Sequence, residues 1–290
     1  MNRYVILTAT YNHPNQLASL YKSLTAQNNK DFSWIIVDDG SKNDTHNLID
    51  EFVNSGEIDI VPIHQDNGGK SSAINNGLNH LDHCVVFVVI VDDDEVLNSN
   101  AIDIVDEYYT KYSNSNCGVI HFNRLNEKGA VIANPIIDND FIMSYQSFKS
   151  NKRSADGYIG YFINKLGDNR FTLYKDEKYI GPSTLFMKVT ENSDLLWAKA
   201  TLGKTEYLAG GITKQGRKLR IKNPKGMIEY CRLMQKKGAN FKTRLAYSIQ
   251  GFAYYYFVDR SQRNFLDLSG LYNLRIFGKI LNILWKRKYT

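Results

Sequence analysis

Residues 85–95, VVFVVIVDDDE, are the most informative stretch of this 290-residue chain for its architecture. The first seven residues are all apolar, and most are β-branched, which suits a pleated strand. A strand that is apolar on both faces is typical of the middle of a parallel sheet, where helices cover both sides. Because four acids follow directly, this strand delivers a cluster of carboxylates to the edge of the sheet at which it ends.

Strand-like and helix-like segments alternate on both sides of this stretch. Further strands are expected at residues 4–9, 33–37, 58–63 and 117–122. Apolar residues recur at helical spacing at residues 17–24, 48–53, 71–81 and 101–108. This order predicts right-handed crossovers and an open, mostly parallel α/β sheet with helices on both faces. Residues 148–176 lack such periodicity and are expected to be irregular, whereas helical patterns return from Lys225 onward.

Composition excludes several classes of protein. Hydrophobic residues make up 43% of the chain and charged residues 23%, which is enough apolar surface for a folded core rather than a disordered chain. Three widely spaced cysteines form neither a disulfide framework nor a zinc pattern, so a reducing cytosol is expected. The apolar runs are shorter than the roughly 20 residues that span a membrane, and we expect neither a membrane span nor a secretory signal.

Charge is distributed unevenly along the chain. Residues 201–290 hold 19 lysines and arginines and 4 acids, a net charge of +15, whereas residues 1–200 carry 17 basic and 26 acidic residues, a net charge of −9. Either the basic helices are an ordinary subdomain with solvated faces, or they attach to an anionic membrane surface. A nucleic-acid partner is not expected, because no recognition motif accompanies the charge.

Polar loops follow four of the expected strands. Ligands bind beyond the carboxyl ends of the strands in open α/β sheets, and here those ends lead into residues 9–15, 38–44, 65–70 and 92–97. Asp92 and Asp94 would share one face of an extended segment, where their oxygens suit Mg²⁺ or Mn²⁺; the alternative is a solvated acidic turn. Four adjacent acids repel one another, so we expect a divalent cation to compensate them.

The other loops have features of a nucleotide site as well as simpler explanations. Asp38-Asp39-Gly40-Ser41 could offer a carboxylate to a base or ribose, or could form an Asx turn that begins a helix. Gly68-Gly69-Lys70 lets the backbone approach a ligand and puts a lysine at a helix start, where it can meet a phosphate. The Walker spacing is absent, which argues against a P-loop.

Together these loops resemble those of family 2 inverting glycosyltransferases. The resemblance rests on Thr8-Ala9-Thr10-Tyr11-Asn12, Val37-Asp38-Asp39-Gly40-Ser41, Asn67-Gly68-Gly69-Lys70 and Asp92-Asp93-Asp94, which stand in the family's order and at its usual spacing over about residues 4–125. It implies the GT-A type of nucleotide-sugar fold, with a C-terminal helical extension. Glu206-Tyr207-Leu208-Ala209-Gly210-Gly211-Ile212-Thr213 further resembles a stretch that closes the catalytic region in bacterial polysaccharide enzymes.

The resemblance also implies roles for individual residues. Tyr11 would pack on the uracil of a UDP-sugar, with Thr8 and Ala9 beside it, and Asp38 would bond the uracil imide. Asn67, Gly69 and Lys70 would line the uridine and the sugar, and Asp93 would meet the ribose. Asp92 and Asp94 would hold Mn²⁺ or Mg²⁺, with Asp94 nearest the metal.

The catalytic base is less clearly marked. Ala155-Asp156-Gly157 matches a Gly-Asp pair that relatives carry before the acceptor segment, so Asp156 is expected at the donor sugar. Relatives often have an acid where this chain has Gly181-Pro182-Ser183-Thr184. Candidate bases are therefore Glu177, Asp176, Asp156 and Glu191, and we take Glu177 and Asp156 as the catalytic pair.

We therefore expect a metal-dependent inverting glycosyltransferase that moves a sugar from a UDP-sugar to a hydroxyl of a growing, lipid-linked polysaccharide. Residues 1–215 would be the catalytic domain, divided into a nucleotide half (1–125) and an acceptor half (126–215), and 216–290 a basic helical region. The enzyme would be cytoplasmic or peripheral on the inner face of the membrane. The alternatives are a non-catalytic nucleotide-sugar-binding module and a nucleotidyltransferase, although the latter would need a basic Gly-rich loop that residues 9–15 lack.

Overall fold

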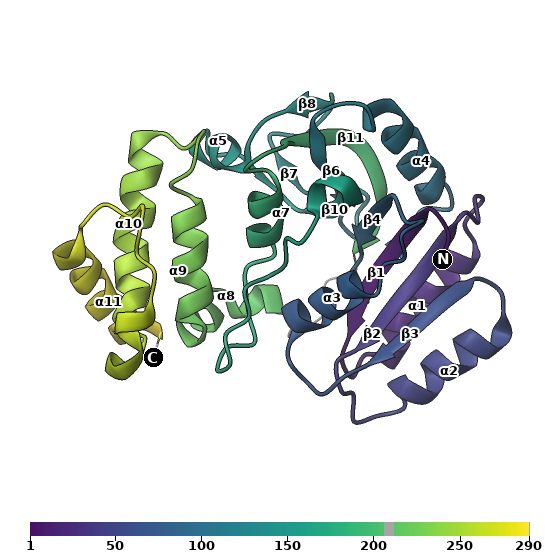
Figure 1. Ribbon diagram of the computed structural model, residues 1–290, viewed down its shortest axis with the longest axis horizontal. Coiled ribbons are helices and arrows are strands. Elements are labelled where there is room, and N and C mark those ends of the chain that lie inside the picture. Colours follow the sequence, from purple (N-terminus) through teal and green to yellow (C-terminus); the bar gives the residue numbers. More distant parts are fainter. Residues whose placement is uncertain (206–211, 290) are drawn as a thin grey trace.

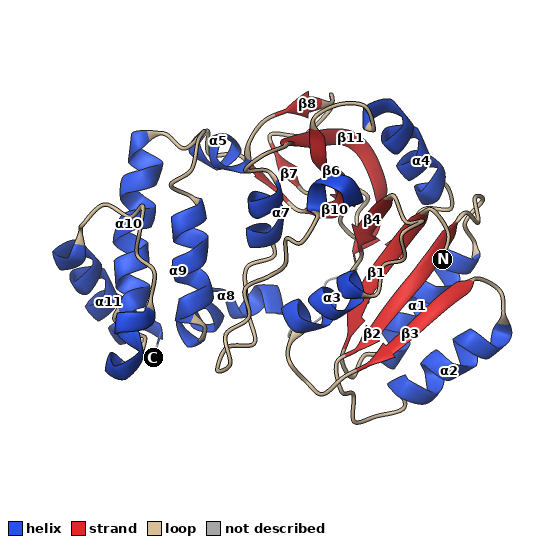
Figure 2. Ribbon diagram, in the orientation of Figure 1, coloured by secondary structure: helices blue, strands red, loops and turns tan. Residues whose placement is uncertain are grey.

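The computed structural model describes residues 1–205 and 212–289 (Figure 1). A nine-stranded sheet with the order β3-β2-β1-β4-β10-β6-β11-β5 forms its centre, and β8 pairs with β11 outside this path. Helices cover the sheet, and further helices follow at the C-terminal end (Figure 2). The expected fold class, an open mixed sheet that is flanked by helices and followed by a helical extension, is confirmed.

The nucleotide half of the sheet is parallel, as expected. It consists of β1 (Tyr4–Thr10), β2 (Phe32–Asp38), β3 (Asp59–His64) and β4 (Phe87–Ile90). Alternate residues of β1 enter different cores: Tyr4 and Ile6 pack on one face of the sheet, and Val5 and Leu7 pack on the other. Side chains on both faces of the strand are therefore apolar, which explains why these strands are continuous apolar runs in the sequence.

The second half of the sheet is mostly antiparallel. It consists of β5 (Glu95–Leu97), β6 (Cys117–Leu125), β8 (Phe141–Ile142), β10 (Gly157–Phe162) and β11 (Asp194–Thr205). Strand β10 runs antiparallel between β4 and β6, so the expectation of irregular structure is wrong at residues 157–162. A separate ladder joins β7 (Ala133–Asn134) to β9 (Ser154–Ala155).

Helices divide between the two faces of the sheet. The first face is covered by α1 (Pro14–Thr25), α2 (Thr45–Ser55) and α4 (Ala101–Tyr112). The second face is covered by α3 (Lys70–Asn79), α5 (Tyr145–Ser150), α6 (Ile163–Leu166) and α7 (Ser183–Val189). Each face therefore has its own apolar core, as a doubly covered sheet requires.

The C-terminal helices pack around a third core, on the opposite side of the molecule from β1, β2 and β3 (Figure 1). They are α8 (Ile212–Lys222), α9 (Pro224–Leu233), α10 (Phe241–Tyr255), a 3₁₀ helix (Arg260–Phe265) and α11 (Arg275–Tyr289). Over the described part of the chain, no helix combines the length and the apolar character that crossing a membrane requires.

Candidate functional site

The carboxyl ends of the parallel strands bring the predicted loops to one edge of the sheet. The register pairs Thr10 of β1 with Asp38 of β2, and Asp38 with His64 of β3. The acidic loop after β4 reaches the same edge, because the Thr10 hydroxyl donates to Asp93 Oδ2 at 2.7 Å. Residues 10, 38, 64 and 93, which are distant in sequence, thus meet where ligands bind in sheets of this kind.

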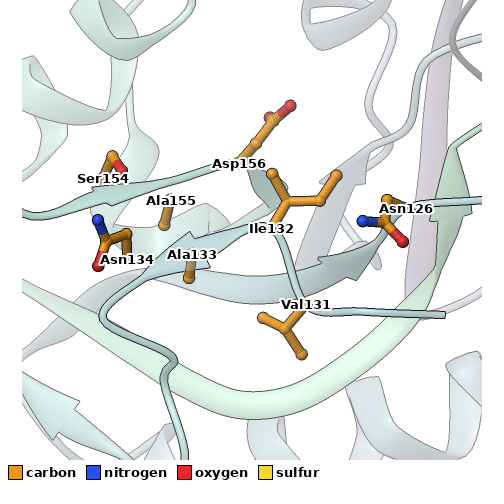
Figure 3. Close-up of a pocket in the computed structure, with 8 residues that line it drawn as sticks. All are labelled: Asn126, Val131, Ile132, Ala133, Asn134, Ser154, Ala155 and Asp156. Carbon is orange, nitrogen blue, oxygen red and sulfur yellow. The ribbon is translucent and has the colours of Figure 1, made fainter. Parts of the chain in front are cut away.

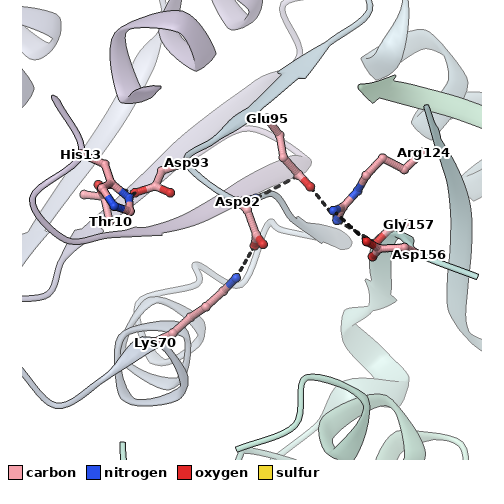
Figure 4. A network of polar contacts seen from close by, with 9 residues as sticks. All are labelled: Thr10, His13, Lys70, Asp92, Asp93, Glu95, Arg124, Asp156 and Gly157. Carbon is pink, nitrogen blue, oxygen red and sulfur yellow. Dashed lines mark hydrogen bonds and ion pairs between the residues drawn. The ribbon is translucent and has the colours of Figure 1, made fainter. Parts of the chain in front are cut away.

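Asp92 is joined to the loop after β3 by Lys70. Lys70 Nζ lies 2.5 Å from Asp92 Oδ1, with both side chains partly exposed (Figure 4). Burial opposes the charged form of the Asp92 carboxyl, but the charges of Lys70 and Arg124 outweigh it and lower the pKa. The lysine at the start of α3 therefore touches the acidic loop.

Asp93 points toward β1 rather than toward Lys70. It is buried and accepts from Thr10, while His13 Nδ1 lies 3.1 Å from its Oδ2. This contact is the main cause of a raised pKa for His13, against the effect of burial. Asp93 therefore fixes the acidic loop to the Tyr11–His13 turn, and its predicted contact with a ribose stays a prediction.

Glu95 and Arg124 continue the network toward Asp156. The Asp92 N–H donates to Glu95 Oε2 at 3.0 Å, and Arg124 Nη2 lies 2.5 Å from Glu95 Oε1. Arg124 Nη1 lies 3.4 Å from Asp156 Oδ2, so one guanidinium connects the back of the acidic loop with Asp156 (Figure 4). Sequence reasoning counted Glu95 among the four acids but did not identify its partner Arg124, because their separation along the chain gives no local signal.

Asp94 differs from its neighbours in its surroundings. Lys70 contacts Asp92, Thr10 and His13 contact Asp93, and Arg124 contacts Glu95. Side chains of the protein therefore compensate three of the four acids, and the expected divalent cation stays a prediction. Within the described residues, no hydrogen bond or ion pair compensates the Asp94 carboxyl in this way, and its pKa is raised by burial and then by the charges of Asp92 and Asp93.

The turn after β1 carries an exposed aromatic ring. Tyr11 is 41% exposed, and Asn12 beside it has a positive φ of 59°. The Asn12 amide oxygen accepts from Lys42 N–H at 2.7 Å, and its own N–H donates to Ser41 Oγ at 2.9 Å. These bonds couple the turn to the loop after β2, so Tyr11 is held beside Asp38.

Thr8, Ala9 and Asp38 lie deeper. The Thr8 hydroxyl is fully buried and accepts from Trp34 Nε1 at 3.0 Å, which favours a packing role for its side chain. Ala9 is half-buried. Asp38 is buried, with Oδ1 accepting from Ser41 N–H at 3.0 Å. Their predicted nucleotide contacts stay predictions.

Asp39 organises the glycine loop, a role that sequence reasoning missed. Its Oδ1 accepts from Gly68 N–H and its Oδ2 from Gly69 N–H, each at 2.8 Å. The Asn67 amide donates to the Asp39 carbonyl at 2.9 Å, and Lys178 Nζ in turn donates to the Asn67 side chain. Gly69, at φ 89°, is required because a Cβ would lie 2.5 Å from the Lys178 carbonyl oxygen.

The predicted catalytic acids have different surroundings. Glu177 is buried, and its two oxygens accept from the N–H groups of Lys225 and Gly226 at 2.7 and 2.9 Å. These are the first residues of α9, so Glu177 satisfies a helix N-terminus. Burial nevertheless raises its pKa to about 7, against these hydrogen bonds. A catalytic role for Glu177 stays a prediction.

The remaining candidate bases lie in ion pairs. Asp176 Oδ1 lies 2.6 Å from Lys225 Nζ, and Glu191 Oε2 lies 3.4 Å from Lys236 Nζ. Asp156 is the candidate that the network of Figure 4 connects to the acidic loop. It also borders a surface hollow beside the β7–β9 ladder (Figure 3). The hollow is lined by Asn126, Val131, Ile132, Ala133, Asn134, Ser154, Ala155 and Asp156.

Two histidines that sequence spacing did not connect meet near Asp38. His46 Nδ1 lies 3.1 Å from His64 Nδ1, and His64 Nδ1 lies 3.5 Å from Asp38 Oδ2. The three side chains could hold a metal ion, with potential ligand atoms within 4.8 Å of one another. The spacing of His46 and His64 along the sequence gives no sign of this arrangement, which β2, β3 and α2 bring together.

Most of the predicted closing stretch, residues 206–213, lies outside the described residues.

Comparisons with known proteins identify the family of the chain. The family model described as "Glycosyl transferase family 2" matches residues 5–171. The minor teichoic acid biosynthesis protein GgaA of Bacillus subtilis (strain 168) is 25% identical over 228 residues, covering 70% of this chain and 51% of that protein. The chain thus spans about half the length of this relative.

Solved structures show the same fold. S. aureus TarS 1–349 in complex with UDP has a TM-score of 0.66 at 14% identity, covering 97% of this chain and 88% of that one. Mannosyltransferase PcManGT from Pyrobaculum calidifontis, in complex with GDP-Man and Mn²⁺, has a TM-score of 0.60 at 12% identity, covering 99% and 88%. At these identities the likeness establishes the fold alone, whereas the family model matches more than half of the chain. The chain therefore belongs to glycosyl transferase family 2.

Proposed function

We propose that the chain is a metal-dependent inverting glycosyltransferase that transfers a sugar from a UDP-sugar to a hydroxyl of a growing, lipid-linked surface polysaccharide. The observation that carries the proposal is the contact between Lys70 and Asp92, at 2.5 Å. It joins the glycine loop and the acidic loop at the edge of the sheet that also carries Tyr11 and Asp38. A nucleotide base, a diphosphate and a sugar need this succession of an aromatic ring, an acceptor and charged groups.

For the donor, the exposed ring of Tyr11 would stack on uracil, and Asp38 would accept the imide N–H. Thr8 and Ala9 would support that base through the strand beneath it. Asn67, Gly69 and Lys70 would line the uridine and the sugar, and Asp93 would approach the ribose. The similarity in fold to a protein solved with UDP supports this choice of nucleotide.

The acidic loop fits a hard divalent cation. Carboxylate oxygens are the ligands that Mg²⁺ and Mn²⁺ prefer. The raised pKa of Asp94, caused by burial and by its acidic neighbours, is what an uncompensated carboxylate in such a loop would have. Asp94 and Asp92 would hold the ion, which would neutralise charge on the leaving diphosphate. Lys70 would add a fixed positive charge beside the same phosphates.

For the acceptor, inversion requires a base on the side of the sugar opposite the leaving nucleotide. We propose Asp156 for this role, because Arg124 connects it to the acidic loop and because it borders the hollow beside the β7–β9 ladder. Asp156 Oδ2 would accept the proton of the acceptor hydroxyl as that oxygen attacks C1. Glu177 is the second candidate, favoured by its raised pKa of about 7.

The similarity to GgaA supports a class of acceptor. GgaA is a teichoic acid biosynthesis protein, which supports a cell-surface glycopolymer as the acceptor. We propose that the chain works at the inner face of the membrane, on a lipid-linked acceptor. Residues 1–215 would form the catalytic domain, with the boundary between its halves near residue 125. Residues 216–290 would form a separate basic region, which the third apolar core supports.

Release of UDP from a panel of UDP-sugars, with and without acceptor, tests this function. We expect turnover to depend on Mn²⁺ or Mg²⁺ and to fall by about 10²–10⁴ in Asp156→Asn, as for loss of a general base. Nucleotide binding without turnover on any acceptor would favour a non-catalytic binding module instead.

Glu177→Gln is the matched variant for the catalytic base. If Glu177 only holds the start of α9, this variant retains kcat within a few-fold and loses stability. A collapse of kcat in Glu177→Gln, with Asp156→Asn active, would transfer the role of base to Glu177.

A further inference from the structure

Helix α11 (Arg275–Tyr289) has two apolar faces. Its inner face packs on α10: a Cβ on Gly278 would lie 2.3 Å from Phe252 Cβ, and the Asn282 amide donates to the Ala253 carbonyl at 3.0 Å. Trp285 packs against Tyr254, with ring centroids 5.0 Å apart. These contacts fix the rotation of the helix, so its outer face is held in one orientation.

The outer face exposes large apolar side chains at helical spacing. They are Ile276, Phe277, Ile280, Ile283 and Leu284, which are between 45% and 75% exposed. This i, i+1, i+4, i+7, i+8 spacing forms a single stripe, and the buried Gly278, Asn282 and Trp285 lie on the opposite side. Single exposed apolar residues are ordinary, but a contiguous stripe marks an interaction surface.

Basic side chains surround this apolar stripe. Arg275 and Lys279 accompany its first half, and Lys286, Arg287 and Lys288 form its C-terminal end. Residues 275–289 contain no aspartate or glutamate. A soluble polyanion would use the charges but would leave the apolar side chains in water. A surface with an apolar interior and negative groups on its outside would contact both the apolar and the basic side chains.

We propose that the outer face of α11 binds an anionic lipid bilayer, with the apolar stripe inserted at the level of the headgroups and the basic side chains on lipid phosphates. The helix lies in the plane of the membrane and does not cross it. Helix α11 lies on the side of the molecule opposite β1–β3 (Figure 1). The proposal goes beyond the glycosyl transfer and does not depend on it.

Vesicle flotation with the full chain tests the proposal. We expect binding to mixed phosphatidylcholine–phosphatidylglycerol vesicles, and much weaker binding to phosphatidylcholine alone. The double variant Phe277→Gln/Ile280→Gln removes two side chains, each worth about tenfold or more in partitioning, so its affinity falls by about 100-fold or more. Lys286→Gln/Lys288→Gln loses about 30-fold in affinity for anionic vesicles, because each basic residue near the surface contributes about 1 kcal/mol.

Val53→Gln is the matched control, because Val53 on α2 is also exposed, at 37%; it leaves flotation unchanged. Two results would overturn the proposal. One is flotation that Phe277→Gln/Ile280→Gln does not reduce. The other is that wild type does not bind vesicles but forms a concentration-dependent dimer, seen by sedimentation, which Phe277→Gln/Ile280→Gln abolishes. The stripe would then bind a second copy of the chain. Neither result depends on UDP-sugar turnover, so failure here is distinguishable from failure of the proposed activity.

Discussion

Lys70 Nζ lies 2.5 Å from Asp92 Oδ1, so the lysine that begins α3 neutralises the first acid of the loop after β4. An ammonium and a metal ion would compete for the same carboxylate. Side chains of the protein therefore compensate most of the negative charge of the acidic loop. Asp94 is the carboxylate at which a bound cation would be stabilised most.

The first prediction follows from this competition. In Lys70→Met, Asp92 loses its positive partner, so Mn²⁺ should bind the nucleotide-free protein more tightly by about two- to five-fold, the value of a partly exposed ion pair. Affinity for UDP should fall in the same variant, because the phosphates lose a positive neighbour. Titration of Mn²⁺ by electron paramagnetic resonance measures the first effect. Unchanged or weaker Mn²⁺ binding would contradict the competition.

The buried pair of Glu95 and Arg124 gives a second prediction. Arg124→Gln leaves the Glu95 carboxylate, 1% exposed, without its cation, and loss of one partner of a buried pair costs about 3–5 kcal/mol. The double variant Glu95→Gln/Arg124→Gln removes both charges and should recover much of this loss. Urea unfolding of the single and double variants measures the coupling. Additive losses would show that the pair is not coupled.

The glycine loop gives a third prediction. Gly69→Ala has two costs. The residue has a positive φ of 89°, and the new Cβ would lie 2.5 Å from the Lys178 carbonyl oxygen. Gly56→Ala is the control, because Gly56 also has a positive φ, 67°, but a Cβ at this position would have no neighbouring atom within 4 Å. Gly56→Ala should cost about 1–2 kcal/mol from backbone strain alone. Gly69→Ala should cost clearly more in urea unfolding and should weaken UDP binding; equal costs would contradict the close approach.

A fourth prediction concerns acid stability. Burial, and then the charge of Arg124, lowers the pKa of His121 to about 3, whereas an unfolded histidine titrates near 6.5. Between these values the unfolded chain binds the extra proton, so His121 lowers the free energy of unfolding as the pH falls below about 6.5, by up to about 1.4 kcal/mol per pH unit. Above about pH 6.5 His121 is neutral in both the folded and the unfolded chain, so it no longer changes the free energy of unfolding with pH.

Urea unfolding at pH 7.5 and pH 5.0 measures this effect, with wild type expected to lose about 2 kcal/mol more than His121→Gln over that interval. His83→Gln is the control, since the His83 side chain is 97% exposed, and it should behave as wild type. Identical pH slopes for wild type and His121→Gln would contradict a buried neutral imidazole.

The nucleotide half was predictable because its signals are local. Apolar runs followed by polar turns identified β1–β4, and the rule that ligands bind beyond strand ends selected the loops that carry Asp38, Lys70 and Asp92. The acceptor half was not predictable in this way. Strand β10 is antiparallel and lies between β4 and β6, and its pairing depends on residues far away in sequence.

The interior of the site was also hidden from sequence reasoning. Asp39 looked like a turn residue, but it accepts from the Gly68 and Gly69 N–H groups. Glu177 was a candidate base from the sequence, but both of its oxygens accept from N–H groups at the start of α9. In each case the carboxylate binds a backbone N–H that the fold brings to it, and no spacing rule reports such contacts.

The proposed function depends most on Asp94, which would hold a divalent cation that helps to bind UDP. Isothermal titration of UDP into wild type and Asp94→Asn, with and without Mn²⁺, tests this role. His64→Asn is the control for the second metal-capable group, formed by Asp38, His46 and His64. We expect Mn²⁺ to tighten UDP binding in wild type and in His64→Asn, and Asp94→Asn to abolish this gain. An equal gain from Mn²⁺ in Asp94→Asn, or no binding of UDP by wild type at all, would contradict the metal role of Asp94.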